Sequence, residues 1–136
     1  MRSLIVEDDL TTRKLLQIYL SDCGDCFAAI NGHEAVEAFE YALDKGEPYG
    51  LICLDIMMPG MNGHEALKAI RKVESDRGIK RPDGVKVIMT TGLSDDNNVT
   101  RAFETGCEAY LVKPVDKEKL FEEMEKLGLV ARQVSE

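Results

Sequence analysis

The chain has 136 residues, 44% of them hydrophobic and 31% charged, and a formal net charge of −8 at pH 7. This length suits one domain of roughly 100–150 residues, and the apolar content is enough for a core, which argues against a disordered chain. The negative charge argues against nucleic acid as a direct partner, because phosphate contacts need a basic patch.

Membrane insertion and secretion are also disfavoured. No apolar run approaches the about 18–20 residues of a transmembrane helix. The start of the chain, Met1–Val6, runs directly into acidic residues, which signal peptides do not do. We therefore expect a cytoplasmic protein with no membrane partner, in which the cysteines are reduced thiols: Cys23, Cys26, Cys53 and Cys107. Cys23 and Cys26 are spaced like a metal or redox pair, but there is no second pair and no strand-to-helix placement.

The first part of the chain predicts two strands and two helices. Ser3–Val6 is an apolar run typical of a strand, and residues at helical spacing follow it: Leu15, Leu16, Tyr19 and Leu20. Cys26–Ile30 is the second predicted strand. Asn31 is a predicted N-cap, with Glu34 three residues later. The helix that begins there has an apolar stripe of Val36, Phe39 and Leu43.

The second part repeats the pattern three times. Leu51–Leu54 is a continuous apolar run, as expected for a strand covered on both faces. A helix from Asn62 or Gly63 buries Leu67, Ile70 and Val73. Ser75–Gly84 is a polar connection and the best candidate for an insertion. The remaining predicted elements are a strand at Val85–Met89, a helix at about Asp95–Thr105 that stops at Gly106, a strand at Ala109–Val112, and a helix from about Asp116 to Leu127 that ends at Gly128.

This alternation of strands and helices predicts a three-layer α/β fold with a parallel sheet and right-handed crossovers. We expect one domain at residues 1–128, followed by a tail or truncated linker at residues 129–136. In such sheets, ligands bind beyond the carboxyl ends of the strands, so residues that follow the strands are candidates for a site.

Acids, hydroxyls and a lysine follow the predicted strands. They are Glu7-Asp8-Asp9, Asp55, Thr90-Thr91-Gly92 and Lys113-Pro114. Two carboxylates ~4 Å apart repel by about 4 kcal/mol at an effective dielectric constant near 20. A hard divalent cation such as Mg²⁺ offsets this repulsion and accepts phosphate oxygens as further ligands. A carboxylate beside a metal ion and a lysine is a suitable acceptor for phosphoryl transfer.

Each of these residues also has a simpler interpretation. Asp9 precedes the first helix and can cap it, and Asp55 can be a cap or a solvated loop residue. Thr91 can be a turn residue, and Lys113 a surface charge. The joint placement at one sheet edge is what favours a site.

Four segments at these positions resemble the receiver domain of two-component response regulators, including the single-domain chemotaxis regulators. They are Leu4–Asp9, Leu54–Gly63, Ile88–Gly92 and Ala109–Pro114. The resemblance covers Arg2 to about Gly128 and rests on all four segments in the same order. It implies a flavodoxin-like (βα)5 fold with a five-stranded parallel sheet in the order 2-1-3-4-5.

The resemblance also implies roles at the acidic edge. Asp55 is expected to be the phosphoacceptor. Glu7, Asp8, Asp55 and the main-chain carbonyl of Met57 are expected to hold Mg²⁺, for which Mn²⁺ can substitute, with a bridging water as one option for Glu7.

Further roles concern the switch. Thr91 is expected to hydrogen-bond the phosphoryl group, Lys113 to pair with another phosphoryl oxygen, and Gly92 to allow close approach. Tyr110 is expected to turn inward when Thr91 moves, although its sequence position also fits a half-buried aromatic with a solvated hydroxyl. The Lys113–Pro114 bond is expected to be cis.

By this resemblance, the chain is a signalling switch and not a turnover enzyme. Its partners are expected to be a histidine kinase or phosphotransfer protein and an unknown downstream protein, with the chain a monomer or a phosphorylation-linked dimer. Phosphorylation is expected to repack the surface formed by the fourth helix, fifth strand and fifth helix. Two apolar residues, Met57 and Leu93, stand where the family tunes dephosphorylation, which leads to the hypothesis of slow self-hydrolysis.

Other functions remain open at this point. A phosphorylation-independent, receiver-like interaction module usually lacks one of the acids, the threonine or the lysine, and this chain has all of them. An aspartyl-phosphate phosphatase needs a second Asp two residues after the first, where this chain has Met57. A flavin-binding protein of the same fold needs a phosphate-binding loop that is not present.

Overall fold

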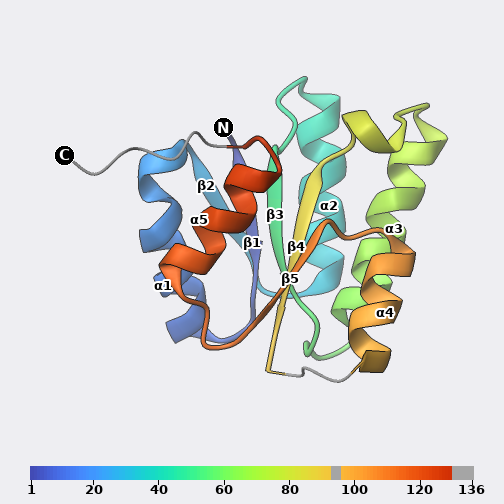
Figure 1. Ribbon diagram of the computed structural model, residues 1–136. Helices are drawn as coiled ribbons and strands as arrows, with labels where there is room; N and C mark the ends of the chain where they lie inside the picture. The colour runs from blue at the N-terminus through green and yellow to red at the C-terminus, as the bar shows by residue number, and fades with distance from the viewer. Residues whose placement is uncertain (93–95, 130–136) are drawn as a thin grey trace.

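The computed structural model describes residues 1–92 and 96–129. In these ranges, five parallel strands form one sheet: β1 (Ser3–Val6), β2 (Cys26–Ala29), β3 (Leu51–Asp55), β4 (Lys86–Thr91) and β5 (Ala109–Val112). The strand order is β2-β1-β3-β4-β5, which confirms the predicted topology. All strand arrows point the same way in Figure 1, so the carboxyl ends of the strands share one edge.

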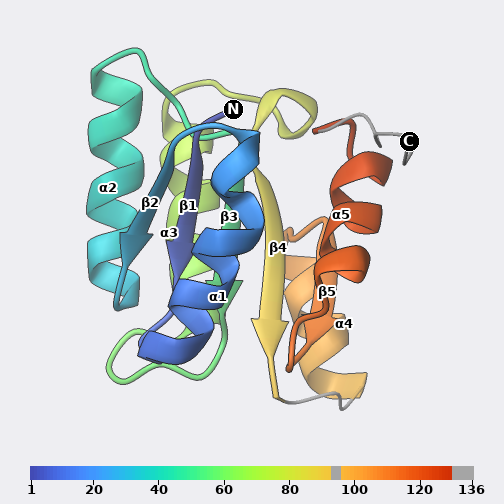
Figure 2. The same cartoon turned by 90° about the vertical axis from the view of Figure 1, so that its left-hand side faces the viewer.

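Helices cover both faces of the sheet, as predicted for a three-layer fold. They are α1 (Leu10–Leu20), α2 (Gly32–Asp44), α3 (Gly63–Asp76), α4 (Asp96–Thr105) and α5 (Lys117–Lys126). Helices α1 and α5 bury one apolar cluster around Ile5, Leu16 and Leu120, and α1 lies in front of the sheet in Figure 2. Helices α2, α3 and α4 bury the other cluster, around Phe39, Leu67 and Ala102.

Side-chain caps fix where several helices begin. The side chain of Asn31 accepts from the backbone N–H of Glu34, which confirms it as the N-cap of α2. Asn62 and Glu65 form a reciprocal capping box at the start of α3. Asp9 accepts from the backbone N–H of Thr12, so its capping role at α1 is real.

Some predicted boundaries are wrong by a few residues. Strand β4 runs on to Thr91 and not only to Met89, because its ladder with β3 and β5 continues past the apolar run. Helix α3 extends to Asp76, so the polar connection starts later than Ser75 and contains a short 3₁₀ turn at Arg81–Asp83. Strand β2 ends at Ala29, one residue before the predicted end.

The buried stripe of α2 also differs in part from the prediction. Phe39 is buried as expected, but Val36 and Leu43 are only half-buried, and the buried positions beside Phe39 are the small residues Ala35 and Ala42. Small side chains let the helix approach the sheet closely. Leu93, Asp95 and the predicted tail beyond Leu129 lie outside the described residues.

All four cysteines are free thiols. Burial raises the pKa of the Cys53 thiol to about 12 and that of Cys107 to about 11. Cys23 and Cys26 are half-buried, and burial raises the pKa of both thiols. Thiols that stay protonated are weak nucleophiles and metal ligands, so these cysteines act as small apolar residues.

Candidate functional site

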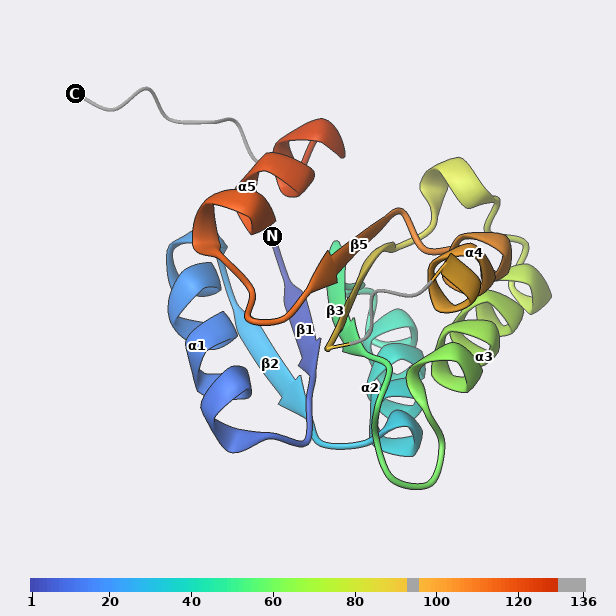
Figure 3. The same cartoon turned by 60° about the horizontal axis from the view of Figure 1, so that its bottom comes forward.

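The sheet topology brings the ends of β1 and β3 together. Val6 pairs with Leu54 across the β1–β3 ladder, so Glu7 and Asp55 leave these strands side by side. The backbone N–H of Glu7 also donates to the carbonyl of Ala29 on β2, which fixes the direction of the chain as it leaves the sheet. Figure 3 views the molecule with this edge brought forward.

The next two strands bring a hydroxyl and a lysine to the same edge. Asp55 pairs with Thr90 on β4, and Thr91 pairs with Val112 on β5. The backbone N–H of Lys113 donates to the carbonyl of Thr91 at 2.7 Å. The Lys113–Pro114 peptide bond that follows is cis. Residues that lie far apart in sequence therefore meet because each follows a parallel strand.

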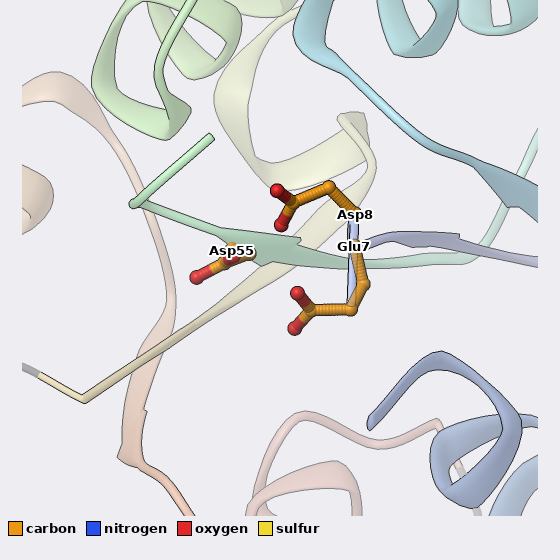
Figure 4. Close-up of side chains that lie close together, drawn as sticks. All are labelled: Glu7, Asp8 and Asp55. Carbon is orange, nitrogen blue, oxygen red and sulfur yellow. The ribbon is translucent and has the colours of Figure 1, made fainter. Parts of the chain in front are cut away.

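Three carboxylates gather at this edge. One oxygen atom from each of Glu7, Asp8 and Asp55 lies within 4.8 Å of the others. Figure 4 shows the carboxylates of Glu7 and Asp8 on either side of the end of β3, where Asp55 lies. Glu7 is fully buried and Asp55 is 2% exposed, whereas Asp8 is open to solvent. The cluster is therefore a buried acidic pair with one accessible acidic neighbour.

Lys113 is the cation that faces this acidic pair. Its Nζ lies 2.5 Å from Oε1 of Glu7 and 3.3 Å from Oδ1 of Asp55. Partial burial alone lowers the pKa of Lys113, but the two carboxylates outweigh it and the net pKa is raised. Lys113 is therefore held in its charged form beside Asp55.

The surroundings of Asp55 change the pKa of its carboxyl group. Burial raises the pKa of its carboxyl group, the negative charge of Glu7 raises it further, and Lys113 opposes both, which leaves the pKa at about 7. A single lysine does not balance three acids in this cluster. The local excess of negative charge would stabilise a further bound cation.

The loop after β3 packs tightly around Asp55. The backbone N–H of Met57 donates to Oδ1 of Asp55 at 3.3 Å, while the Met57 side chain is 62% exposed. Gly63 packs so closely beneath Asp55 that a Cβ atom at this position would overlap the Asp55 carbonyl oxygen. The sequence predicts Gly63 only as a possible helix start, and its place directly after a capping Asn is the one local signal of this contact.

The residues predicted to act as a switch lie on β4 and β5 or directly after β4. Thr91 is fully buried at the end of β4, and Tyr110 is half-buried on β5, paired with Met89. Gly92 is exposed and follows Thr91 directly. Leu93, the second predicted tuning residue, lies outside the described residues.

The donor set fits a hard divalent cation. All three clustered side chains offer carboxylate oxygens, with no sulfur or imidazole ligand among them. Mg²⁺ prefers one or two carboxylates and keeps several waters, and the exposed Asp8 provides a side open to solvent. The residues present therefore fit magnesium better than a soft transition metal.

Comparison with known proteins agrees with this geometry. Residues 3–125 match the family model described as the response regulator receiver domain. The chain is 34% identical over 128 residues to the regulatory protein VanRB of Enterococcus faecalis, covering 93% of this chain and 52% of that protein. It is 30% identical over 132 residues to the probable histidine kinase 2 of rice (Oryza sativa subsp. indica), covering 90% of this chain and 12% of that protein. The chain thus spans at most about half the length of these relatives.

Solved structures share the fold over nearly the whole chain. The chemotaxis protein CheY4 of Vibrio cholerae superposes with a TM-score of 0.76 at 25% identity, covering 93% of this chain and 97% of that chain. CheY in the CheX–CheY–BeF3–Mg complex of Borrelia burgdorferi gives a TM-score of 0.79 at 26% identity, covering 94% and 89%. Among the described residues, no helix has both the length and the apolar character that crossing a membrane requires.

Proposed function

Because this chain belongs to the response regulator receiver domain family, a family of signalling modules, we propose that it accepts a phosphoryl group on Asp55 with Mg²⁺ and passes on a signal by changing shape. The observation that carries the proposal is the position of the Asp55 carboxylate. It is buried, lies 3.3 Å from the Lys113 ammonium group, and clusters with two further carboxylates. Positioning and charge neutralisation are what phosphoryl transfer chiefly needs.

The proposed metal ligands are Glu7, Asp8, Asp55 and the main-chain carbonyl of Met57. The mutual distances of the three carboxylates and the accessible side at Asp8 support this set. When bound, Mg²⁺ supplies positive charge that neutralises the phosphoryl oxygens during transfer. Mn²⁺, which has similar ligand preferences, is expected to substitute for it.

In the proposed reaction, a carboxylate oxygen of Asp55 attacks the phosphorus of a phosphohistidine on a histidine kinase or phosphotransfer protein. The new O–P bond forms as the P–N bond breaks, and the electron pair of that bond stays on the imidazole nitrogen. Lys113 already lies beside the attacking carboxylate and is positioned to pair with a phosphoryl oxygen. One solved structure named above, the CheX–CheY complex of Borrelia burgdorferi, contains beryllofluoride and magnesium and shares this fold.

The proposed output surface is formed by α4, β5 and α5. Figure 3 shows β5 between these two helices. Thr91 ends β4 directly before the connection to α4, and Tyr110 lies within β5, so movement of Thr91 toward a phosphoryl group reaches both elements. Phe103 on α4 and Val112 on β5 are 47% and 46% exposed, which supports contact with a downstream protein or a second copy of the chain.

The test is intact mass after incubation with acetyl phosphate, with and without Mg²⁺. We expect one phosphoryl adduct that requires Mg²⁺ and that Asp55→Asn abolishes. Asp9→Asn is the matched control, since Asp9 caps α1 and lies outside the carboxylate cluster. If the folded wild type forms no adduct, a phosphorylation-independent module is the better interpretation. Continuous release of phosphate through many rapid turnovers would favour a phosphatase.

A further inference from the structure

A polar contact joins α3 to α4 close to the acceptor. His64 lies in the first turn of α3 and is 3% exposed. Its Nε2 lies 3.1 Å from Oδ1 of Asn98, which is in the first turn of α4. Because an amide oxygen only accepts, Nε2 carries the proton and donates. The other ring nitrogen, Nδ1, is buried without a hydrogen-bond partner among the described residues. Within residues 1–92 and 96–129, the hydrogen bond of this buried ring therefore goes to α4.

The α3 end of this contact is fixed to the acceptor. The residue before His64 is Gly63, whose backbone N–H donates to the Ile56 carbonyl at 2.9 Å. Gly63 also packs directly against the backbone of Asp55. The first turn of α3 therefore cannot shift without moving the backbone of the acceptor residue. The contact between His64 and Asn98 links α4 to a fixed point beside Asp55.

The far end of α4 is held differently. Arg71 on α3 donates to the carbonyl of Gly106, directly after α4, from Nη2 at 2.7 Å and from Nε at 3.0 Å. The Arg71 guanidinium group is itself paired with the buried Glu74 and the half-buried Glu108. Among the described residues, α4 is thus held to α3 by a charged anchor far from Asp55 and by the uncharged His64–Asn98 hydrogen bond near it. Neutral bonds are weaker than charge-assisted ones, so the end near Asp55 is the one more easily released.

Phosphorylation of Asp55 would change its contact with Lys113. Lys113 contacts Asp55 directly at 3.3 Å, whereas a phosphoryl group on Asp55 would have to lie between the two side chains. A cleft of about 530 Å³ lies beside the His64–Asn98 contact, lined by Met57, Asn62 and Arg101 among others. The cleft leaves room for the first turns of α4 to move relative to the loop after β3.

We propose that the His64–Asn98 hydrogen bond is a latch that holds the start of α4 in its unphosphorylated position and opens as the chain switches. This inference rests on the proposed function and adds a regulatory contact to it. If the latch stabilises only the unphosphorylated conformation, breaking it raises the population of the other conformation. Ligands that bind that conformation then bind more tightly, because less free energy is spent on the change in shape.

The first test is the dissociation constant of beryllofluoride, a phosphoryl mimic, measured by calorimetry in the presence of Mg²⁺. We expect His64→Leu and Asn98→Ala to bind about fivefold more tightly than the wild type, the scale of one neutral hydrogen bond. His64→Gln keeps a donor of similar reach and should bind like the wild type. Asn97→Ala makes the same chemical change at the exposed neighbouring position on α4 and should have no effect.

The outcomes of this test separate the latch from the function beneath it. A wild type that fails to bind beryllofluoride with Mg²⁺ would overturn the proposed function and the latch together. A wild type that binds, with His64→Leu and Asn98→Ala binding equally well or more weakly, would overturn the latch alone. Failure of His64→Gln to restore wild-type affinity would assign the effect to loss of the ring and not of the bond.

Amide hydrogen exchange provides a second test that needs no phosphoryl mimic. In His64→Leu, we expect faster exchange over residues 97–101 of α4, with residues 102–105 unchanged because the Arg71 anchor remains. Faster exchange along the whole helix would indicate general destabilisation, and unchanged exchange would show that the bond holds nothing. Either result would overturn the latch.

Discussion

The two edges of the sheet both hold buried charges, but these charges are fully paired at one edge and only partly paired at the other. At the amino ends of β4 and β5, Arg71 pairs with Glu74 at 2.7 Å and with Glu108 at 2.9 Å. Glu74 also accepts the N–H of Val85, and Glu108 accepts the N–H of Val87 as well as a bond from Arg81. Each acid there has a cation and a backbone donor.

At the carboxyl ends, Glu7 and Asp55 share Lys113, and Asp8 is a third carboxylate in the same cluster. The burial of Asp55 and the nearby charge of Glu7 raise the pKa of Asp55, and Lys113 opposes both effects only in part. Buried charges that are fully paired fit a structural role, whereas a buried acid with a raised pKa beside further acids is typical of a functional site.

The largest expected effect is at the balanced edge, which is formed by Arg71, Glu74 and Glu108. Arg71→Met leaves Glu74 and Glu108 without their shared cation, and should lower the free energy of unfolding by about 3–5 kcal/mol. Arg77→Met is the matched control, because Arg77 pairs with the exposed Asp44 and its loss should cost about 0–1 kcal/mol. Urea denaturation of both variants measures the difference. If both variants lost the same free energy of unfolding, the buried pairs of Arg71 would be no more important for stability than an exposed ion pair.

At the unbalanced edge, formed by Glu7, Asp8, Asp55 and Lys113, we expect a substitution to increase the free energy of unfolding. Asp55→Asn removes one buried negative charge from the cluster and should raise the free energy of unfolding at pH 8, without Mg²⁺, by on the order of 2 kcal/mol. The same urea titration in EDTA measures the change. Asp44→Asn removes an exposed carboxylate and should not stabilise the chain. A destabilised Asp55→Asn would mean that the Asp55 carboxylate contributes to folding.

A bound cation should relieve the same imbalance. At a free Mg²⁺ concentration ten times its dissociation constant, the free energy of unfolding should rise by about 1.4 kcal/mol, from binding to the native state alone. Asp8→Asn should remove most of this gain, because Asp8 is the clustered carboxylate that is open to solvent. Thermal melts with and without Mg²⁺ provide the measurement. A gain that persists in Asp8→Asn would place the ion elsewhere.

The smallest expected effect concerns the lifetime of the phosphorylated state. The exposed Met57 thioether lies beside the acceptor and offers no group that orients an attacking water. Met57→Asn should therefore shorten the half-life of the phosphoryl group several-fold, and Leu93→Glu should add to this. Loss of the mass adduct over time measures the half-life, with the neighbouring Met58→Leu as a conservative control. An unchanged half-life in Met57→Asn would contradict the hypothesis of slow self-hydrolysis.

The sequence was sufficient to predict that the residues of the unbalanced edge lie together, because a simple rule applies to them. Glu7, Asp55 and Lys113 each follow an apolar run, and the carboxyl ends of parallel strands must meet. The topology followed from the alternation of elements and from the family resemblance. The end of β4 was predicted too early, because Thr90 and Thr91 extend the ladder without extending the apolar pattern.

The ion pairs of the balanced edge could not be predicted from the sequence in the same way. Arg71 bonds to Glu108, which lies 37 residues away, and no local pattern pairs them. One signal was present, since His64, Arg71 and Glu74 fall on the helical stripe that carries Leu67 and Ile70. A polar residue in an apolar stripe indicates a buried partner, but it does not identify that partner.

The close packing of Gly63 under Asp55 limits which sequences can occupy this fold. Any side chain at position 63 would displace the backbone that holds the acceptor, although glycine contributes no functional group of its own. In a library that samples every substitution, this position should tolerate almost nothing, even among variants selected only for phosphorylation in the presence of excess donor. Position 64, by contrast, should tolerate several residues under that selection. Under a selection for signalling, its tolerance should narrow to those residues that can still donate to Asn98.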